Sequence, residues 1–378
     1  SGTNDVALRD ANALDLGTVG VGQNLTVTTG GALTDSGAIT VDSLATIVST
    51  GQSVTLGDST TANFGSLDFS GAAVSIKEGS SMEIAASEAT GILTLEASGA
   101  ITQTGAIDAD LTSGFTAGAN AITLSDASND FTGAVSLSNS GTNDVALRDA
   151  NALDLGTVGV GQNLSLTAAG AISDTGVVTV AGTTTLDNSA GSSAAILLDS
   201  ASTYTGNVTF TTDTGSDVTI TDNSDFAIQS GLNVNNLSIT STGSVTDLGD
   251  IDIDGTLTVS AAGQTIDLSG TGNDLTGAVT LTGAAITLVD TTATSIAGIT
   301  ATGALGVTSG GAITDSGSLS IMGDATFTNT LGNNDTITLD DSSNAFGGTV
   351  TFVTDSGSAV TIVAVSYTHL TLPTKQAV

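Results

Sequence analysis

The sequence is poor in the residues on which most binding and catalytic sites depend. It has no Cys, one His, one Pro and four basic residues in 378. A disulfide framework and a thiolate metal site are therefore excluded. The clustered Lys and Arg that hold phosphate or anionic lipid are missing, which argues against a nucleic-acid or membrane-surface partner. No apolar run approaches the roughly 20 residues of a spanning helix, so we expect no membrane insertion.

What is present is small, apolar and acidic. The chain has 48 Gly, 38 acidic residues and a net charge of −34, with 39% hydrophobic but only 3% aromatic residues. A charged fraction of 11% is too low for a disordered chain of this hydrophobicity. The composition predicts a thin core of small aliphatic side chains rather than a wide globular one.

Residues 365–378 differ in composition from everything before them. This tail holds the only His, His369, and the only Pro, Pro373, but no Gly and no Asp. The string VSYTHLTLPT at 365–374 matches the translated end of a transposase-type sequencing-library adapter. We interpret 365–378 as a non-native tail at the end of an assembled DNA fragment, and we expect it to add no strand, because it lacks the turn-forming residues and Pro cannot donate to a ladder.

Residues 1–364 are repetitive. Residues 1–25 recur unchanged at 140–164. A turn signature such as GAITDSG occurs five times, and a bulky residue closely followed by Gly and Val or Leu, as in FTGAV, also occurs five times. The two sets of marker glycines, which share one spacing, are Gly31, Gly99, Gly170, Gly243 and Gly311, and Gly65, Gly133, Gly206, Gly277 and Gly348. Two markers with one period predict a repeat of about 70 residues.

Short segments with alternating apolar residues, bounded by Gly, Asp, Asn and Ser, predict many short strands. We expect an all-β fold with 1–364 as a single parallel β-solenoid, in which each full circuit of the chain is a rung and about three rungs make a repeat, on the order of 15 rungs in all. Each set of marker glycines should then lie in a line along one edge. Residues 77–96 are the exception to the pattern and are open to a short helix or long loop.

The repeats, which run ITLxDxxNxFxGxV, then NDVALRDANALDLGTVxVGxNLxVT and then GAITDSG, resemble those of filamentous-haemagglutinin-like bacterial adhesins. These proteins are exported by autotransporter or two-partner secretion. The resemblance implies a right-handed parallel β-helix, an extracellular position at the bacterial cell surface and an adhesive or structural role. A chain without Cys also suits export, because it carries no cross-links to impede threading through a pore.

A search for chemistry yields no catalytic, cofactor-binding or metal-binding residue. A nucleophile–His triad is impossible upstream of the tail. Arg9 and Arg148 occupy the same slot of an identical repeat, which suggests an outward position, and Lys77 is the remaining cation upstream of the tail. The recurring Asp35, Asp174, Asp247 and Asp315, with Gln103 in the same slot, are interpreted as turn formers that cap backbone N–H groups. The bulky residues Phe64, Phe131, Tyr204, Leu275 and Phe346 are interpreted as core.

The sequence therefore predicts a structural or adhesive stalk segment of a large secreted surface protein, without enzyme activity or cofactor. Two alternatives stay open: a β-helix enzyme acting on polysaccharide, which would need paired acids with Arg or Lys in a groove, and a solenoid stabilised by calcium at its Asp-rich turns. A protein or glycan surface is the expected ligand, if there is one. Because the solenoid has no recognisable cap at either end, we also expect end-to-end self-association.

Overall fold

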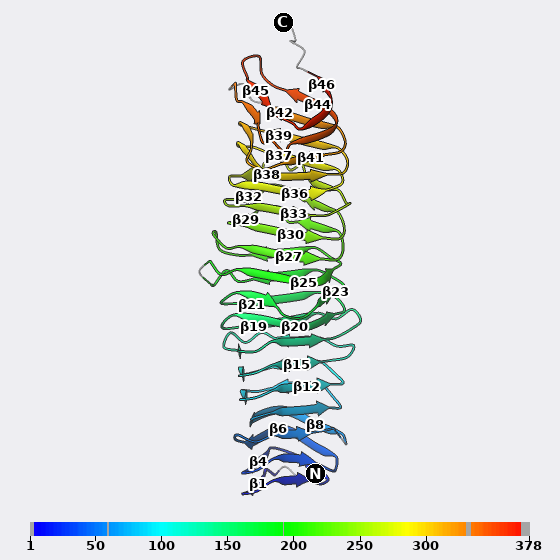
Figure 1. Cartoon of the computed structure of the whole chain (residues 1–378). Coiled ribbons are helices and arrows are strands. Elements are labelled where there is room, and N and C mark those ends of the chain that lie inside the picture. The colour runs from blue at the N-terminus through cyan, green and yellow to red at the C-terminus, as the bar shows by residue number, and fades with distance from the viewer. Residues whose placement is uncertain (1–3, 59, 192, 330–333, 372–378) are drawn as a thin grey trace. The chain divides into compact units, whose positions relative to one another are not determined.

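The computed structural model describes residues 4–58, 60–191, 193–329 and 334–371, with the backbone alone for 366–371. The chain forms two compact units, residues 1–192 and 193–378. In the described ranges all regular structure is β-strand, in 46 pieces of 2 to 11 residues. The strands follow one another in successive rungs within each compact unit (Figure 1).

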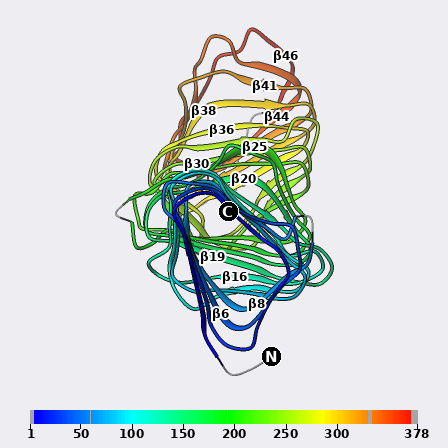
Figure 2. The same cartoon turned by 90° about the horizontal axis from the view of Figure 1, so that it is seen from below.

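In the first compact unit each rung has three sides. The strands of one rung pair in parallel with those of the next rung: β1 (Val6–Asp10) with β4 (Leu25–Thr29), β2 (Leu14–Leu16) with β5 (Leu33–Asp35), and β3 (Val19–Val21) with the start of β6 (Ile39–Ser49). Figure 2, in which the rungs are seen from below, shows the chain of this compact unit winding in closed circuits.

The second compact unit is built in the same way. Three strands again pair in parallel with the three that follow them: β27 (Val218–Asp222) with β30 (Leu237–Ser241), β28 (Phe226–Ile228) with β31 (Val245–Asp247), and β29 (Leu232–Val234) with β32 (Ile251–Ile253). The expected parallel β-solenoid is thus confirmed. It has about 18 rungs rather than the expected 15.

The core of each compact unit is a column of small aliphatic side chains. Residues alternate between buried and outward positions along each strand, as in β12 (Leu93–Ala97), where Leu93, Leu95 and Ala97 are buried. The parallel, in-register pairing stacks like on like, for example Leu93 on Val74 of β9 (Val74–Glu78). Alternation with a period of two therefore decides which side chains enter the core, as the sequence pattern predicted.

The sequence repeat does not close in a whole number of rungs. Leu33, which follows the marker Gly31, lies in a ladder with Val54, Val74 and Leu93. The equivalent residue of the next repeat, Ile101, begins the strand after that of Leu93, β13 (Ile101–Gln103). Three rungs thus end at Leu93, and one further side is needed to complete the repeat. Each repeat makes about three and a third rungs, which explains the higher rung count.

The same offset occurs at each later step that lies within one compact unit. Ile101 stacks on Ile122, Val145 and Leu164 in turn, and the next marker precedes Ile172, one strand further on. In the second compact unit, Val245 leads through Ile266 and Ile286 to Leu305, and the marker Gly311 precedes the following strand.

The second marker shifts in the same way. Phe64 stacks on Val41, whereas Phe131 stacks on Ala109, Ala89 and Gly71, which belong to the next side of the coil. The prediction that each set of marker glycines lines one edge is therefore wrong. Equivalent residues of successive repeats move from one side of the coil to the next, because a repeat is three rungs plus one further side.

The marker glycines are needed where the chain passes close to the rung before it. A Cβ added at Gly31 would overlap the backbone of Asn12 and Ala13, and one added at Gly170 would lie 2.9 Å from the amide nitrogen of Ala152. Neither Gly31 nor Gly170 has a positive φ. Close packing of rungs at a corner, rather than an unusual backbone conformation, therefore requires Gly there.

Residues 77–96 do not leave the coil. They contain the end of β9, β10 (Met82–Ile84), β11 (Ser87–Ala89) and most of β12, each paired in parallel with a neighbouring rung. The alternative of a helix or long loop in this segment is therefore wrong. Its glutamates occupy outward strand positions, apart from Glu78, which is buried.

Part of the tail does form a strand. The backbone of β46 (Ser366–Thr371) pairs in parallel with β44 (Ala345–Val353), with His369 opposite Thr349. The expectation that the tail adds no strand is thus wrong for this segment, because a parallel edge can be extended through backbone groups alone. Residues 372–378, including Pro373, lie outside the described ranges, and the pairing does not bear on the origin of the tail.

Identical residues differ in burial according to their neighbours. Val6 and Leu8 of β1 are 43% and 40% exposed, whereas Val145 and Leu147 of β19 (Val145–Asp149), in the identical repeat, are buried. Strand β19 lies between β16 (Ile122–Leu124) and β21 (Leu164–Ala168). A neighbour on both sides, and not the local sequence, therefore completes the core of a rung.

Candidate functional site

Four buried carboxyl groups recur at one position of the repeat. Each ends a strand, and each is only 1% exposed: Glu78 in VSIKE, Asp149 in VALRD, Asp222 in VTITD and Asp290 in ITLVD. The alternation that turns the preceding Val or Ile and Leu or Ile inward also turns the acid inward. We call these four side chains the buried acids.

The buried acids hold the bulky residue of the preceding rung by its backbone. Glu78 Oε1 accepts a hydrogen bond of 2.8 Å from the amide of Phe64, Asp222 Oδ1 accepts one of 3.1 Å from Tyr204, and Asp290 Oδ1 accepts one of 3.3 Å from Leu275. At Asp149 the amide of Phe131 lies close enough to lower the pKa of the carboxyl group as a donor. The acid therefore satisfies a backbone N–H group at the corner.

The same acids also bind the turn that follows them. The amide of Asn151 donates to Asp149 at 3.0 Å, and the Ser80 hydroxyl donates to Glu78 at 3.0 Å. In Asp290 both oxygens are used, because Oδ2 accepts a hydrogen bond of 3.0 Å from Thr294. Glu78 Oε2 and Asp149 Oδ2, in contrast, are buried without a hydrogen-bond partner.

Burial changes the acidity of three of these groups, Glu78, Asp149 and Asp222. It raises the pKa of Glu78 to about 7, against the opposing effect of the hydrogen bonds from Phe64 and Ser80. It raises the pKa of Asp149 to about 6, and the negative charge of Asp130 adds to this rise. The pKa of Asp222 is also raised by burial. Removal from water disfavours the charged form of a carboxyl group, so these acids hold their protons to a higher pH than usual.

A second polar position recurs at another corner. Asn129, Asn273 and Asn344 are fully buried shortly before the bulky marker, where the other repeats have Ala62 and Ser202. Asn273 Oδ1 accepts from the amide of Ile251 at 3.1 Å, and Asn344 Oδ1 accepts from the amide of Leu319 at 2.8 Å. Each of these two asparagines thus binds the start of a strand in the preceding rung.

The recurring Asp or Gln of the GAITDSG signature is the partner of this asparagine. Asn273 donates to Asp247 at 2.8 Å, Asn344 donates to Asp315 at 2.6 Å, and Asn129 donates to Gln103 at 2.9 Å. Asp247 and Asp315 also accept backbone N–H groups, and Asp35 accepts that of Gly57 at 2.8 Å. Asp174 is buried as well. The interpretation as caps of backbone N–H groups is confirmed for Asp35, Asp247 and Asp315, with the capped groups in the following rung.

The predicted core residues are in the core. Phe64, Phe131, Tyr204, Leu275 and Phe346 are all at most 5% exposed. They do not stack on one another, because each lies on a different side or rung. Phe131 instead packs edge-to-face against Phe115, with 5.9 Å between the ring centroids. Phe346 packs edge-to-face against Phe327, with 6.4 Å between the ring centroids.

Arg9 and Arg148 lie outside, as predicted, and so does Lys77. Lys77 Nζ lies 2.7 Å from Glu96 Oε1, in an ion pair about half exposed on each side. Such pairs contribute little to stability. The side chain of His369 is outside the described part of the structure.

Outward-facing acids stack along the surface. Glu88, Asp108 and Asp130 are register partners on three successive rungs, and Asp252 and Asp274 are partners in the second compact unit. Partial burial and the neighbouring acids raise the pKa of Asp108 and of Asp252. Within the described ranges no group of three or more His, Cys, Asp or Glu side chains has a geometry that could hold a metal ion.

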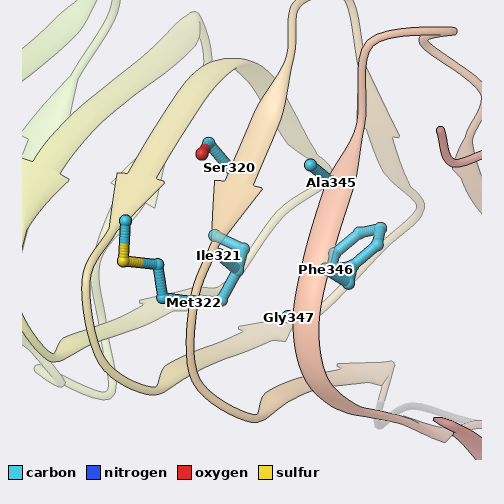
Figure 3. A pocket seen from close by; sticks show the side chains of 6 residues that line it. All are labelled: Ser320, Ile321, Met322, Ala345, Phe346 and Gly347. Atoms are coloured by element: carbon cyan, nitrogen blue, oxygen red, sulfur yellow. The ribbon is translucent and has the colours of Figure 1, made fainter. Parts of the chain in front are cut away.

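Two hollows on the described surface differ in size and lining. One hollow of about 220 Å³ lies between the strands of Ile321 and Phe346, with Ser320, Met322, Ala345 and Gly347 around it (Figure 3). It contains no titratable group. A larger hollow of about 580 Å³ beside β1 and β4 contains Arg9 and Asp10, a single acid. Neither hollow brings together the two carboxyl groups that glycoside hydrolysis requires.

No helix in the described ranges is long and apolar enough to cross a membrane. The sequence matches a family model described as repeats of unknown function (DUF5649) five times, at residues 3–68, 71–138, 142–212, 215–282 and 283–353. The chain belongs to the DUF5649 repeat family. One DUF5649 repeat corresponds to the sequence repeat of three and a third rungs. Neither the curated proteins nor the solved structures contain a significant match to the chain.

The buried acids of the DUF5649 repeats were missed in the sequence, although a signal for them was present. The strings VSIKE, VALRD, VTITD and ITLVD share one slot of the period. Two inward apolar residues at alternating positions place the acid inward as well. A repeated acid in phase with a core pattern therefore predicts a buried carboxyl group, whereas a repeated acid out of phase predicts a solvated one.

Proposed function

We propose that this chain is a structural segment of a large secreted bacterial surface protein, which spaces other parts of that protein from the cell and performs no catalysis. The observation that carries the proposal is the offset of one side per repeat. Because of it, the equivalent outward residues of successive repeats occupy different sides of the coil. A protein that binds a ligand along one face would instead gain from repeats that close in whole rungs and align their exposed residues.

The chemistry of the interior supports the same proposal. In the described part of the chain, the repeated polar side chains that are buried in the corners hold backbone groups of neighbouring rungs. A substrate would have to compete with these hydrogen bonds. The surface carries stacked acids, and neither the hollow beside Phe346 nor the one beside Arg9 brings two carboxyl groups together. The net charge of −34 would also repel an anionic polysaccharide.

A tip-display experiment tests the spacer role. The full chain is fused between a bead and a binding domain of known ligand, and a second fusion lacks residues 31–98, one repeat, so that Gly30 is joined to Gly99. We expect both to fold and both to retain binding through the tip. Beads that carry the chain alone should bind neither cultured cells nor a panel of polysaccharides, and should release no reducing ends. Saturable binding by the chain alone would favour adhesion along its length, and released sugar ends would favour the enzyme.

The extracellular position is part of the proposal and needs its own test. The chain can be placed upstream of a bacterial autotransporter barrel with a secretory leader. The cysteine-free sequence is expected to reach the cell surface, where added protease degrades it on intact cells. Retention in the periplasm, with a control passenger exported normally, would count against a secreted role.

A further inference from the structure

The buried acids differ in how completely the fold satisfies them. Asp290 uses both carboxyl oxygens in hydrogen bonds. Glu78 and Asp149 each leave one oxygen buried and without a partner, although each side chain is only 1% exposed. A charged carboxylate would leave a bare negative oxygen in the core there, whereas a protonated carboxyl group would leave a neutral O–H.

The surroundings of Glu78 offer no compensating charge. The charged side chains on the strands packed around it are Asp68, Lys77, Glu83 and Glu96. Lys77 and Glu83 are exposed, and Glu96, half-exposed, is paired with Lys77. Asp68 is half-buried and bonded to Thr46. None of them contributes to the raised pKa of Glu78, which comes from burial.

The surroundings of Asp149 add negative charge. Asp130, on the strand of the preceding rung, raises the pKa of Asp149 further, and Asp126 lies half-buried in the loop before it. Arg148, the adjacent residue, is exposed. The site thus contains hydrogen-bond donors for one oxygen only, and no cation for the other.

We propose that the corners at Glu78 and Asp149 are proton-binding sites, which make the first compact unit more stable at mildly acid pH than at neutral or alkaline pH. The proton occupies the buried oxygen without a partner, Glu78 Oε2 or Asp149 Oδ2. Ionisation then puts a negative charge beside the core and weakens the corner, which also anchors the amide of Phe64 or Phe131. The fold thereby couples the cohesion of neighbouring rungs to the pH of the surroundings, whatever the protein spaces or binds.

Thermodynamic linkage sets the sign of this dependence. The pKa of Glu78 in the folded chain, about 7, and that of Asp149, about 6, lie above the ordinary values of 4.5 and 3.8. The stability that a raised pKa contributes is fully present below the unfolded value and is lost as pH rises through the folded value. The window of loss therefore runs from about pH 4 to about pH 7.

Carbon-13 NMR of the full chain labelled at the glutamate carboxyl carbon tests the proposal directly. The chain has four Glu, namely Glu78, Glu83, Glu88 and Glu96, so at most four signals need to be followed, and the Glu78→Gln variant identifies the signal of Glu78. We expect that signal to titrate near pH 7. A Glu78 signal that titrates near the ordinary value of 4.5 would overturn the proposal. If all four signals of the wild type titrate near that value, the same conclusion follows without any variant.

Thermal unfolding between pH 5 and pH 8 provides the second reading. The wild type is expected to melt at a lower temperature at pH 8 than at pH 5. The double variant Glu78→Gln with Asp149→Asn should lose part of that difference, because its corners stay neutral. Glu83→Gln, which removes a charge from the surface, is the matched control. A double variant whose pH dependence equals that of the control would contradict the proposal.

Discussion

The side-chain amide of Asn344 donates a hydrogen bond of 2.6 Å to the carboxylate of Asp315, 29 residues earlier in the chain. The carbonyl oxygen of the same amide accepts the N–H of Leu319 at 2.8 Å. One fully buried side chain thus satisfies a repeated acid and the start of a strand together. The substitution Asn344→Ala removes both hydrogen bonds and leaves the buried N–H of Leu319 without its acceptor, while the half-buried Asp315 keeps its bonds from the amides of Asp340 and Asp341.

We expect Asn344→Ala to lower the free energy of unfolding by about 1–3 kcal/mol, since a buried backbone donor is left unsatisfied. Denaturant unfolding measures the change. Ser342→Ala, in the exposed part of the same turn, is the control and should change stability little. A loss no larger than that of Ser342→Ala would mean that water replaces the amide at this corner.

Stacked surface acids should make stability depend on salt. Asp108 lies between Glu88 and Asp130 in the ladder, and like charges directly opposite one another destabilise a sheet by a few tenths to about 1 kcal/mol per pair. We expect Asp108→Asn to raise the melting temperature at low salt and to reduce its rise with added NaCl. Asp199→Asn, a change at an exposed acid of the second compact unit, should do so less. Equal melting temperatures at low and high salt would contradict the repulsion.

Adding calcium in the same assay distinguishes screening of the surface charges from binding at a specific calcium site. At matched ionic strength we expect CaCl₂ and NaCl to raise the melting temperature by similar amounts, because the described acids form no group that could hold a metal ion. A calcium effect far above that of NaCl would instead support the calcium-stabilised alternative.

The marker glycines should tolerate no side chain, unlike glycines on open faces. A Cβ at Gly170 would lie 2.9 Å from the amide nitrogen of Ala152, whereas a Cβ at Gly159 would meet nothing within 4 Å. We expect Gly170→Ala to cost about 1–3 kcal/mol through overpacking, and Gly159→Ala to be neutral within about 0.5 kcal/mol. Chemical denaturation of the two variants checks this. Equal costs would show that the rungs at this corner can separate freely.

At the bulky marker position, replacement by a smaller apolar residue should cost less stability than replacement by Ala, which leaves a cavity. Phe131 is 1% exposed and packs against Phe115 at 5.9 Å, while the same slot of another repeat holds Leu275. Phe131→Ala is expected to cost about 3–5 kcal/mol, and Phe131→Leu about 1.5 kcal/mol or less if the core repacks. A similar loss for both, measured by denaturant unfolding, would mean that the aromatic contact rather than the filled volume matters.

The sequence predicted the fold class because alternation and period are local properties. Val145 and Leu147 are buried and Arg148 is exposed as the pattern requires. The number of sides per rung is not a local property. It follows from where the corners bend, which depends on contacts such as that of Gly31 with Asn12 and Ala13 in the preceding rung. For that reason the period of the repeat was predicted correctly, whereas the alignment of the marker glycines was not.

For the buried acids, too, the local sequence predicts the inward position but not the hydrogen-bond partner. The strand pattern around Glu78 is regular, and its inward phase could have been predicted from VSIKE. The amide of Phe64, which donates to Glu78, lies 14 residues earlier in the chain. The two groups meet only because the chain winds back into the next rung. Residues 77–96 were misinterpreted because their charges suggested a short helix or long loop, although most of those charges occupy outward strand positions.

The most direct test of the offset between repeats is a distance between two spin labels. The chain has no Cys, so cysteine pairs at Thr34 and Thr94, and at Thr34 and Thr102, can be labelled cleanly. Thr34 and Thr102 are equivalent in the repeat, whereas Thr94 lies three rungs on in the ladder that starts beside Leu33. We expect a backbone separation of about 14 Å for the 34/94 pair, at about 4.8 Å per rung, and a clearly longer distance for the 34/102 pair. The reverse order, with the equivalent positions closer together, would show that the repeat closes in whole rungs and would contradict the offset on which the proposed function rests.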